Sequence, residues 1–255
     1  MQTPDAIRPL AGELLLAAWE AGAAGHELRR PLALLSAAIP GAQQAALGAL
    51  PLVARDLLLL RLRELTFGPE LAVFASCPEC AERMEFTLHA PDLAKDLGAA
   101  CDAASNGPVG WAEGDQRYRL RPVTTDDLIA ALAAPDLQTA QDLLLARCVE
   151  ATGEARAERS KSPAKSAPFS PGARGRFEEL HAGAELRCVV ECPGCAGQQV
   201  LDLDIARFLW REVAAAATRL LREVHLLATA YGWREQDILA LSPRRRAAYL
   251  ELAGA

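Results

Sequence analysis

The sequence predicts an α+β protein that is mainly α-helical, with a small antiparallel, zinc-ribbon-like sheet surrounded by helices. Alanine and leucine dominate the 255 residues and only 5% are aromatic, which is typical of helices packed through small and medium side chains. Two Cys-Pro-x-Cys turns each lie between strand-like runs. Elsewhere, apolar residues recur at the helical period. These observations favour helices arranged around one small sheet that is held by cysteines.

The two cysteine turns have the spacing of metal ligands, with CPEC at Cys77–Cys80 and CPGC at Cys192–Cys195. Two intervening residues let both sulfurs of a turn face a common metal position, and two turns supply the four thiolates that tetrahedral Zn²⁺ prefers. We expect Cys77, Cys80, Cys192 and Cys195 to bind one structural Zn²⁺ as the cofactor. Four thiolates leave no open coordination position, so the metal should stabilise the fold and not catalyse a reaction.

The two turns also belong to an internal repeat of the form strand, turn, strand, helix. Both turns are followed by alanine, and apolar residues occupy the sixth and eighth positions after the second cysteine: Phe86, Leu88, Leu201 and Leu203. More than a hundred residues separate the turns, whereas four-cysteine zinc motifs normally have ~15–20 between their halves. A long insertion is compatible with one shared site because closure entropy grows only logarithmically with loop length.

Other interpretations of the cysteines stay open at this stage. A thioredoxin-like CxxC would precede a long helix, whereas both turns here continue into strands. Disulfides are disfavoured because nothing marks the chain as secreted. A CxxC thiol-redox protein, a disulfide pair and a degenerate site that no longer binds metal are therefore the alternatives to a structural zinc site.

Charge and motif content exclude several classes of function. The net charge of −6 is unusual for a general nucleic-acid binder, which is more often basic. No secretory signal or membrane span is recognised, since apolar runs such as Leu57–Leu60 are soon interrupted by charges. No phosphate loop or catalytic motif is present. We expect a cytoplasmic protein that is not an enzyme, with no catalytic residue, no small-molecule substrate and no membrane partner.

The chain is expected to have four regions. Residues 1–50 form an N-terminal helical region, whose first helix opens at Thr3-Pro4. Residues 51–150 hold the first cysteine turn and a helical insert. Residues 151–176 are rich in serine, proline and basic residues and are expected to be a flexible linker. Residues 177–255 hold the second turn and the C-terminal helices.

The helix that leads into the first turn is expected at Pro51–Thr66. It places Leu58, Leu62 and Leu65 on one apolar face, with Arg63 turned away from that face. We expect this helix to pack against the zinc-bound sheet.

Several elements are expected between the two cysteine turns. They are a short helix at Pro91–Leu97, a polar loop at Cys101–Gly114, a strand at Tyr118–Arg121, and a helix from Asp136 to about Val149. Thr124 and Asp127 have the spacing of a capping box and predict the start of one more helix.

The longest helix is expected after the second turn, from Asp204 to about Tyr231, where Gly232 provides a left-handed cap. A short helix (Arg234–Leu241) and a terminal helix opened by Ser242-Pro243 follow.

Five segments together resemble one protein family. They are RDLLLLRLRELTFG, CPEC, CPGC, DIARFLWREV and LLREVHLLATAYGWREQDILALSPRRRAAYLEL. This order resembles the baseplate hub or hub-assembly proteins of contractile phage tails and of phage-tail-like contractile injection systems. The resemblance covers roughly Leu50–Gln138 and Phe177–Ala255, and its most specific part is the C-terminal run.

The resemblance implies a non-enzymatic structural or assembly role in a baseplate, with other baseplate, hub or spike proteins as partners. The protein would then act in the cytoplasm or be incorporated in the assembled particle. Aromatic residues and arginines are the usual anchors of protein interfaces. We therefore expect partners to contact a C-terminal set of residues: Trp233, Arg244, Arg245, Arg246 and Tyr249.

The alternative from a different class is a zinc-ribbon nucleic-acid-binding adaptor. The triple arginine Arg244–Arg246 is the best basic patch of the chain. A nucleic-acid interface would also need stacking aromatics and a generally positive face, and the acidic balance of the chain argues against it.

Overall fold

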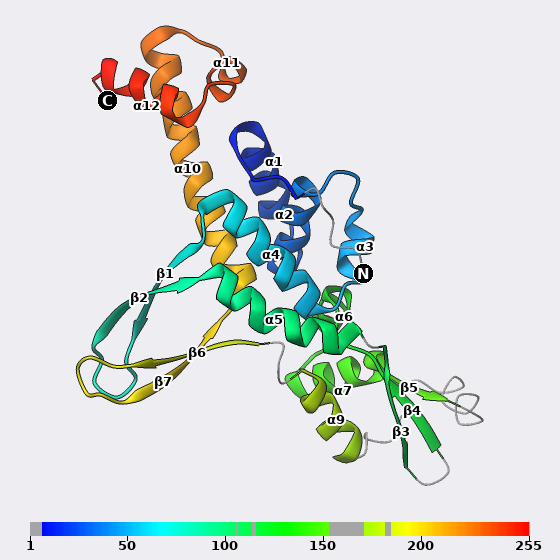
Figure 1. Cartoon of the computed structure of the whole chain (residues 1–255). Coiled ribbons are helices and arrows are strands. Elements are labelled where there is room, and N and C mark those ends of the chain that lie inside the picture. Colours follow the sequence, from blue (N-terminus) through cyan, green and yellow to red (C-terminus); the bar gives the residue numbers. More distant parts are fainter. Residues whose placement is uncertain (1–6, 106, 114–115, 153–170, 182–184, 255) are drawn as a thin grey trace.

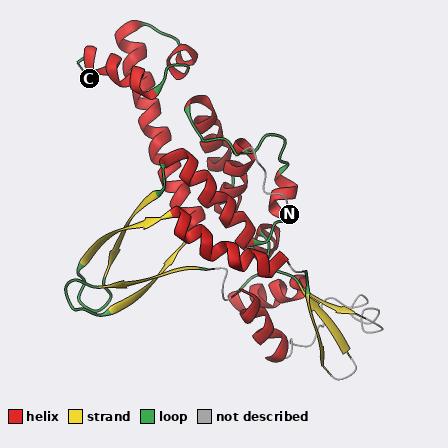
Figure 2. Ribbon diagram, viewed as in Figure 1, coloured by secondary structure: helices red, strands yellow, loops and turns green. Residues whose placement is uncertain are grey.

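The computed structural model describes residues 7–105, 107–113, 116–152, 171–181 and 185–254, and the following statements concern these residues. The protein is mainly helical, with small antiparallel sheets (Figures 1 and 2). This part of the predicted fold class is confirmed. No described helix combines the length and apolar character needed to cross a lipid bilayer.

A helical body forms the centre of the molecule. Its elements are α1 (Gly12–Ala23), the 3-10 helix η1 (Glu27–Arg29), α2 (Arg30–Ala38), α3 (Gln44–Gly48), α4 (Leu52–Phe67), α5 (Ala90–Ser105) and the first half of α10 (Ile205–Tyr231). Helix α4 packs against α2, α5 and α10, and α1 packs against α2 and α10. The core is rich in leucines, as the composition predicted.

Two separate β-hairpins project from this body, and the expectation of one sheet is wrong (Figure 1). The first hairpin pairs β1 (Glu70–Ser76) with β2 (Arg83–His89), and the second pairs β6 (Leu186–Glu191) with β7 (Gln198–Leu203). Each cysteine turn closes its own hairpin. The sequence could not distinguish one shared sheet from two separate hairpins. The strand patterns show which faces are apolar, but not which strands pair.

The two hairpins have the same register, which confirms the internal repeat. Leu71 pairs with Leu88 in the first hairpin, and Leu186 pairs with Leu203 at the equivalent place in the second. The first hairpin is followed directly by α5, and the second is followed by α10 after the single residue Asp204. The repeat therefore consists of a cysteine-tipped hairpin and the helix that follows it.

The insert between the repeats has a small core of its own. It contains α6 (Thr125–Ala131), α7 (Leu137–Cys148), α9 (Pro171–His181) and a sheet of β3 (Val109–Glu113), β4 (Gln116–Leu120) and β5 (Val149–Thr152). The predicted capping box at Thr124 and Asp127 is confirmed. Burial opposes ionisation of Asp127, but hydrogen bonds from Arg121, Thr124 and Arg147 lower its pKa well below the usual range.

Three boundary predictions are wrong. Helix α5 continues past Leu97 to Ser105 because Leu93, Leu97 and Cys101 form one buried stripe, and β3 occupies most of the remaining expected loop. The expected linker is ordered at both ends, in β5 and α9, and its residues 153–170 lie outside the described residues.

The expected helix opening at Thr3-Pro4 also lies outside the described residues, and α1 begins only at Gly12. The preceding segment runs across the body in a non-helical conformation. The Arg8 N–H donates to the Ala38 carbonyl (2.9 Å), and the Leu10 N–H donates to Thr66 Oγ1 (3.1 Å). These long-range bonds take the place of helical ones.

Arg63 is buried, so the expectation that it turns away from the packed face is wrong. Its guanidinium binds both carboxylate oxygens of Glu212 on α10 (3.0 and 2.8 Å) and donates to the Gly68 carbonyl (2.7 Å). Helix α4 is thus packed on the side of α10 as well as on its leucine face, where Leu58 and Leu62 are buried and Leu65 is 37% exposed. The Arg63–Glu212 pair joins the two halves of the chain.

The C-terminal helices form a distinct C-terminal knob, which we define as residues 219–254: the end of α10, α11 (Glu235–Leu239) and α12 (Pro243–Leu252). Helix α10 ends at Gly232 in a left-handed conformation (φ 68°), and the Ser242 hydroxyl caps α12, both as predicted. The knob has its own apolar cluster around Val224, Leu227 and Ile238. It lies at the end of α10 that projects beyond the body (Figure 1).

Two helical glycines give a matched test of the packing between α1 and α10. A Cβ at Gly22 would lie 2.4 Å from Trp210 Cζ3, whereas a Cβ at Gly98 would meet nothing within 4 Å. We predict that Gly22→Ala lowers the free energy of unfolding by about 1–3 kcal/mol. Gly98→Ala should raise it by about 0.5–1 kcal/mol because alanine favours the helix. Denaturant unfolding of both variants measures this, and equal effects would contradict the packing described.

Candidate metal centre

The four cysteines of the two turns meet where the tips of the hairpins come together. Their sulfur atoms all lie within 4.8 Å of one another. The Cys77 and Cys195 sulfurs are 3.7 Å apart, and the Cys80 and Cys192 sulfurs are 3.6 Å apart. Each of these close pairs joins one hairpin to the other, so the cluster belongs to both halves of the chain.

The backbone forms the same loop in both turns. The N–H of the first cysteine donates across the loop, from Cys77 to the Glu82 carbonyl and from Cys192 to the Gly197 carbonyl, each at 2.9 Å. Ala81 and Ala196 then adopt left-handed conformations, with φ of 60° and 56°. A left-handed conformation costs a non-glycine residue ~1–2 kcal/mol. The same strained conformation occurs in both turns, which fits a loop shaped to present two sulfurs.

The spacing of the sulfurs fits a tetrahedral metal. Zn–S bonds of ~2.3 Å place the corners of a tetrahedron ~3.8 Å apart, close to the two short separations of 3.6 and 3.7 Å. Disulfide sulfurs would be ~2.05 Å apart, and all four cysteines are free. Cys77, Cys80, Cys192 and Cys195 could therefore hold one metal ion through four thiolates.

The Cys77 and Cys195 thiols have opposite pKa shifts. N–H groups of Cys80 and Glu79 point at the Cys77 sulfur and lower its pKa to about 7. The Gly197 N–H favours the Cys195 thiolate, yet the neighbouring sulfurs of Cys80, Cys192 and Cys77 outweigh it and raise the Cys195 pKa to about 12. The Cys77 thiolate thus forms readily, whereas ionisation of Cys195 is opposed. A divalent cation would remove that opposition, because metal binding displaces the thiol protons.

One half of the cluster is buried and the other half faces solvent. Cys77 and Cys192 are 2% and 1% exposed, whereas Cys80 and Cys195 are exposed. Beneath the buried pair lies a small apolar cluster from both hairpins: Met84, Ala75, Phe86 and Val190. This cluster is small compared with the core of the body, so the sulfurs are the main connection available at the tips.

The two turns differ at the positions where they face each other. A Cβ at Gly194 would lie 3.1 Å from the Cβ of Glu82, and one at Gly197 would lie 2.9 Å from a carboxylate oxygen of Glu79. In the repeat, Gly194 is equivalent to Glu79, and Gly197 is equivalent to Glu82. Each glutamate therefore lies against a glycine of the other turn. Two copies of the first turn would instead bring carboxylates together, so the sequence favours pairing of unlike hairpins.

The expected partner-binding residues lie in the C-terminal knob, away from the cysteines (Figure 1). The ring centroids of Trp233 and Tyr249 are 4.8 Å apart, and both rings also contact Tyr231. Both side chains are partly buried in the knob, so they help to hold it together.

Arg246 does not face outward as expected. It is 6% exposed and donates to Glu223 (2.7 Å) and to the Leu241 carbonyl (2.6 Å). The triple arginine made all three residues look equivalent, but in a helix the third lies on a different face from the first two. Arg244 and Arg245 are exposed.

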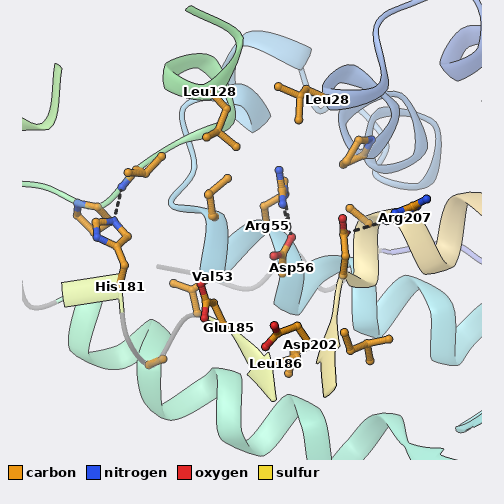
Figure 3. Close-up of a pocket in the computed structure, with 18 of the residues that line it drawn as sticks. Leu28, Val53, Arg55, Asp56, Leu128, His181, Glu185, Leu186, Asp202 and Arg207 are labelled. Atoms are coloured by element: carbon orange, nitrogen blue, oxygen red, sulfur yellow. Dashed lines mark hydrogen bonds and ion pairs between the residues drawn. The ribbon is translucent and has the colours of Figure 1, made fainter. Parts of the chain in front are cut away.

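A pocket of about 700 Å³ lies between the body, the insert and the second hairpin (Figure 3). Apolar side chains line it, among them Leu28, Val53, Leu128 and Leu186. The Arg55 guanidinium binds Asp56 (2.8 Å) and Thr125 Oγ1 (3.0 Å). These residues were not singled out from sequence, because Arg55 and Thr125 are distant along the chain and no local motif marks them.

Asp56 and His181, two titratable side chains that line this pocket, are both engaged in hydrogen bonds. Burial raises the pKa of Asp56, although the adjacent Arg55 opposes this shift. Burial lowers the pKa of His181, whose Nε2 accepts from the Val123 N–H (3.0 Å) and whose Nδ1 lies 2.6 Å from the Phe177 carbonyl. Both ring nitrogens are engaged, so His181 holds α9 against the segment before α6.

Comparisons with known proteins give no relative for this chain: no family model matches it, and neither a curated protein nor a solved structure is significantly similar.

The four-cysteine cluster predicts how many metal ions each chain binds. The purified protein should hold about one zinc ion per chain, and Cys80→Ser or Cys195→Ser should reduce this to well below half because three thiolates bind less tightly. Elemental analysis after gel filtration measures the metal content. Cys188→Ser is the matched control, since Cys188 lies in the second hairpin but outside the cluster. Equal zinc content in all variants would contradict the assignment.

Removal of the metal should also destabilise the protein. Metal binding and folding are linked, so a chelator should lower the thermal midpoint of the wild type. The chelator should have little effect on Cys80→Ser, which has already lost the metal. A wild-type protein whose unfolding does not respond to the chelator would show that the cluster is not a structural metal site.

Proposed function

We propose that the protein is a non-enzymatic structural or assembly component of the baseplate of a contractile phage tail or phage-like injection system, with one structural Zn²⁺. The observation that supports the structural Zn²⁺ is the position of four thiols close together at the tips of two hairpins. The two hairpins are more than a hundred residues apart in the sequence. The zinc ion would hold the two halves of the repeat together by binding cysteines of both hairpins.

The arrangement of the ligands supports a structural role for this metal. All four coordination positions of a tetrahedral ion would be occupied by thiolates, which leaves none for a substrate or an activated water. The apolar cluster at the hairpin tips is small. Metal binding would therefore supply much of the free energy that holds the tips together, as it does in other small metal-bound folds.

The baseplate part of the proposal depends on the sequence resemblance. Two of the segments that carry it, RDLLLLRLRELTFG and DIARFLWREV, contain Arg63 and Glu212, which form the ion pair between α4 and α10. The fifth and most specific segment corresponds to most of the C-terminal knob. Two of the segments that carry the resemblance therefore lie on helices that contact each other.

Nucleic acid is disfavoured as a partner by the charge around the cysteines. A zinc-ribbon adaptor would present arginines and lysines beside the metal to bind phosphates. Here Glu79 and Glu82 lie in the first turn and Glu191 directly precedes the second. The proposed partners are therefore other baseplate, hub or spike proteins, and the exposed arginines of the knob are the proposed contact residues.

Particle assembly tests this proposal. The double variant Arg244→Ala/Arg245→Ala should lower the yield of assembled tail particles at least about tenfold, because arginines at interfaces often contribute strongly to binding. Its unfolding should match the wild type, since both side chains are exposed. Particles would be counted by electron microscopy after complementation of a gene deletion.

The control is Arg29→Ala/Arg176→Ala, which removes two exposed arginines outside the knob. Tyr249→Ala is unsuitable as the only test because Tyr249 packs within the knob. Normal particle yield in the deletion strain, or in cells that make the Arg244/Arg245 variant, would contradict the baseplate role.

A further inference from the structure

The paired hairpins form an arm that extends away from the helical body (Figures 1 and 2). We define the arm as residues 70–89 and 185–203. The inner faces of the hairpins supply the apolar cluster beneath the cysteines. The outer faces are not covered by any described element, because Phe74, Val189 and Val200 are strongly exposed.

The outer faces expose large apolar side chains where polar ones are expected. Phe74 is 68% exposed, and Val189 and its cross-strand partner Val200 are 65% and 62% exposed. An antiparallel ribbon with one covered face normally has polar residues on the other. Phe74 and Val189 occupy equivalent positions in the repeat. The same exposed apolar position thus occurs on both hairpins, which is typical of a binding surface.

The arm also concentrates negative charge. Seven carboxylates lie within it, against two arginines, Arg83 and Arg187; the carboxylates are Glu70, Glu79, Glu82, Glu85, Glu185, Glu191 and Asp202. The whole chain has a net charge of −6. Four thiolates around one Zn²⁺ would add further negative charge at the tip. A surface that binds the arm should therefore be basic and should offer apolar contacts to Phe74 and Val189.

The C-terminal knob of the same protein has both properties. Five exposed arginines lie on it, against three exposed carboxylates; the arginines are Arg219, Arg222, Arg234, Arg244 and Arg245. The Arg246–Glu223 pair holds the start of α12 against α10. Arg222, Arg244 and Arg245 are neighbours of these two residues in sequence, so they lie near the contact between the two helices. The knob also exposes apolar side chains: Leu221, Leu226, Tyr231 and Leu252.

We infer that the arm of one copy of the protein docks onto the C-terminal knob of a second copy. The two surfaces have opposite charge, and both expose apolar side chains without a described cover. Within one chain they lie at different ends of the molecule, so they face outward in different directions (Figure 1). Contact between arm and knob therefore requires two molecules, arranged head to tail.

Head-to-tail contact leaves a free arm and a free knob at the two ends of every pair. Such a heterologous interface continues from copy to copy and produces a ring if the rotation closes, or a filament if it does not. Because the charges are exposed, the association should weaken as salt is added. The inference uses the same arginines, Arg244 and Arg245, that the baseplate proposal assigns to a partner. It is therefore tested by self-association of the purified protein and not by particle assembly.

Charge reversal separates this inference from association through other surfaces. The arm variant is Glu70→Lys/Glu85→Lys/Glu191→Lys, and the knob variant is Arg222→Glu/Arg244→Glu/Arg245→Glu. All six residues are exposed. Each variant alone would place like charges at the interface and should weaken self-association at least about 100-fold. An equimolar mixture of the two variants should associate again, because each reversed surface then meets a reversed partner.

Sedimentation velocity of the 255-residue chain, supplied with zinc, at low and high salt measures these outcomes. The charge control is Glu20→Lys/Glu178→Lys/Glu179→Lys, with exposed residues outside both surfaces. Phe74→Ser should weaken association, whereas Leu137→Ser, which removes an exposed leucine from the insert, should not. Zinc content and thermal unfolding verify that each variant is folded.

Two results would overturn the inference. One is a wild-type protein that stays monomeric at low salt up to ~100 µM, a concentration at which even weak, transient interfaces are populated. The other is association that survives both charge reversals, or that is not restored when the two variants are mixed. Binding of the arm to a basic protein without self-association would also count against a second copy as the occupant.

Discussion

The meeting of four cysteines at the tips of two hairpins is the constraint on which the rest of the arm depends. Each hairpin is a two-stranded ribbon, which is marginally stable by itself in water. The bases of both ribbons are anchored in the leucine core, through residues such as Leu71 and Leu186. Their tips share only a small apolar cluster and the four sulfurs. A bound metal would therefore fix both the distance and the angle between the two ribbons.

The two halves of the chain are joined both at the helical body and at the hairpin tips. At the body, Arg63 of α4 binds Glu212 of α10, so the helix before the first hairpin contacts the helix after the second. At the tips, the thiols provide the second connection. A surface that must meet another protein at a defined angle benefits from this rigidity, because less freedom is lost when the contact forms. The proposed functions of the arm and the knob depend on this rigidity.

The sequence predicted the helices and helix caps that depend on residues close together in the chain. The Thr124 capping box, the Gly232 cap and the apolar stripe of α10 all appear where expected, because neighbours within one or two turns determine them. The four cysteines also come together as predicted, since their turns repeat. The pairing of strands and the ion pairs between distant helices could not be predicted. The burial of Arg63 depends on Glu212, and the separation into two hairpins depends on which strands meet.

The most direct test of the central claim is the X-ray absorption fine structure, at the zinc edge, of the purified protein supplied with zinc. The metal should have four sulfur neighbours at ~2.3 Å and no nitrogen or oxygen in its first shell. This result would show that both cysteine turns bind the same ion, since each can supply only two sulfurs. Two or three sulfurs completed by nitrogen or oxygen, or the absence of tightly bound metal, would contradict a zinc ion that holds the two halves together.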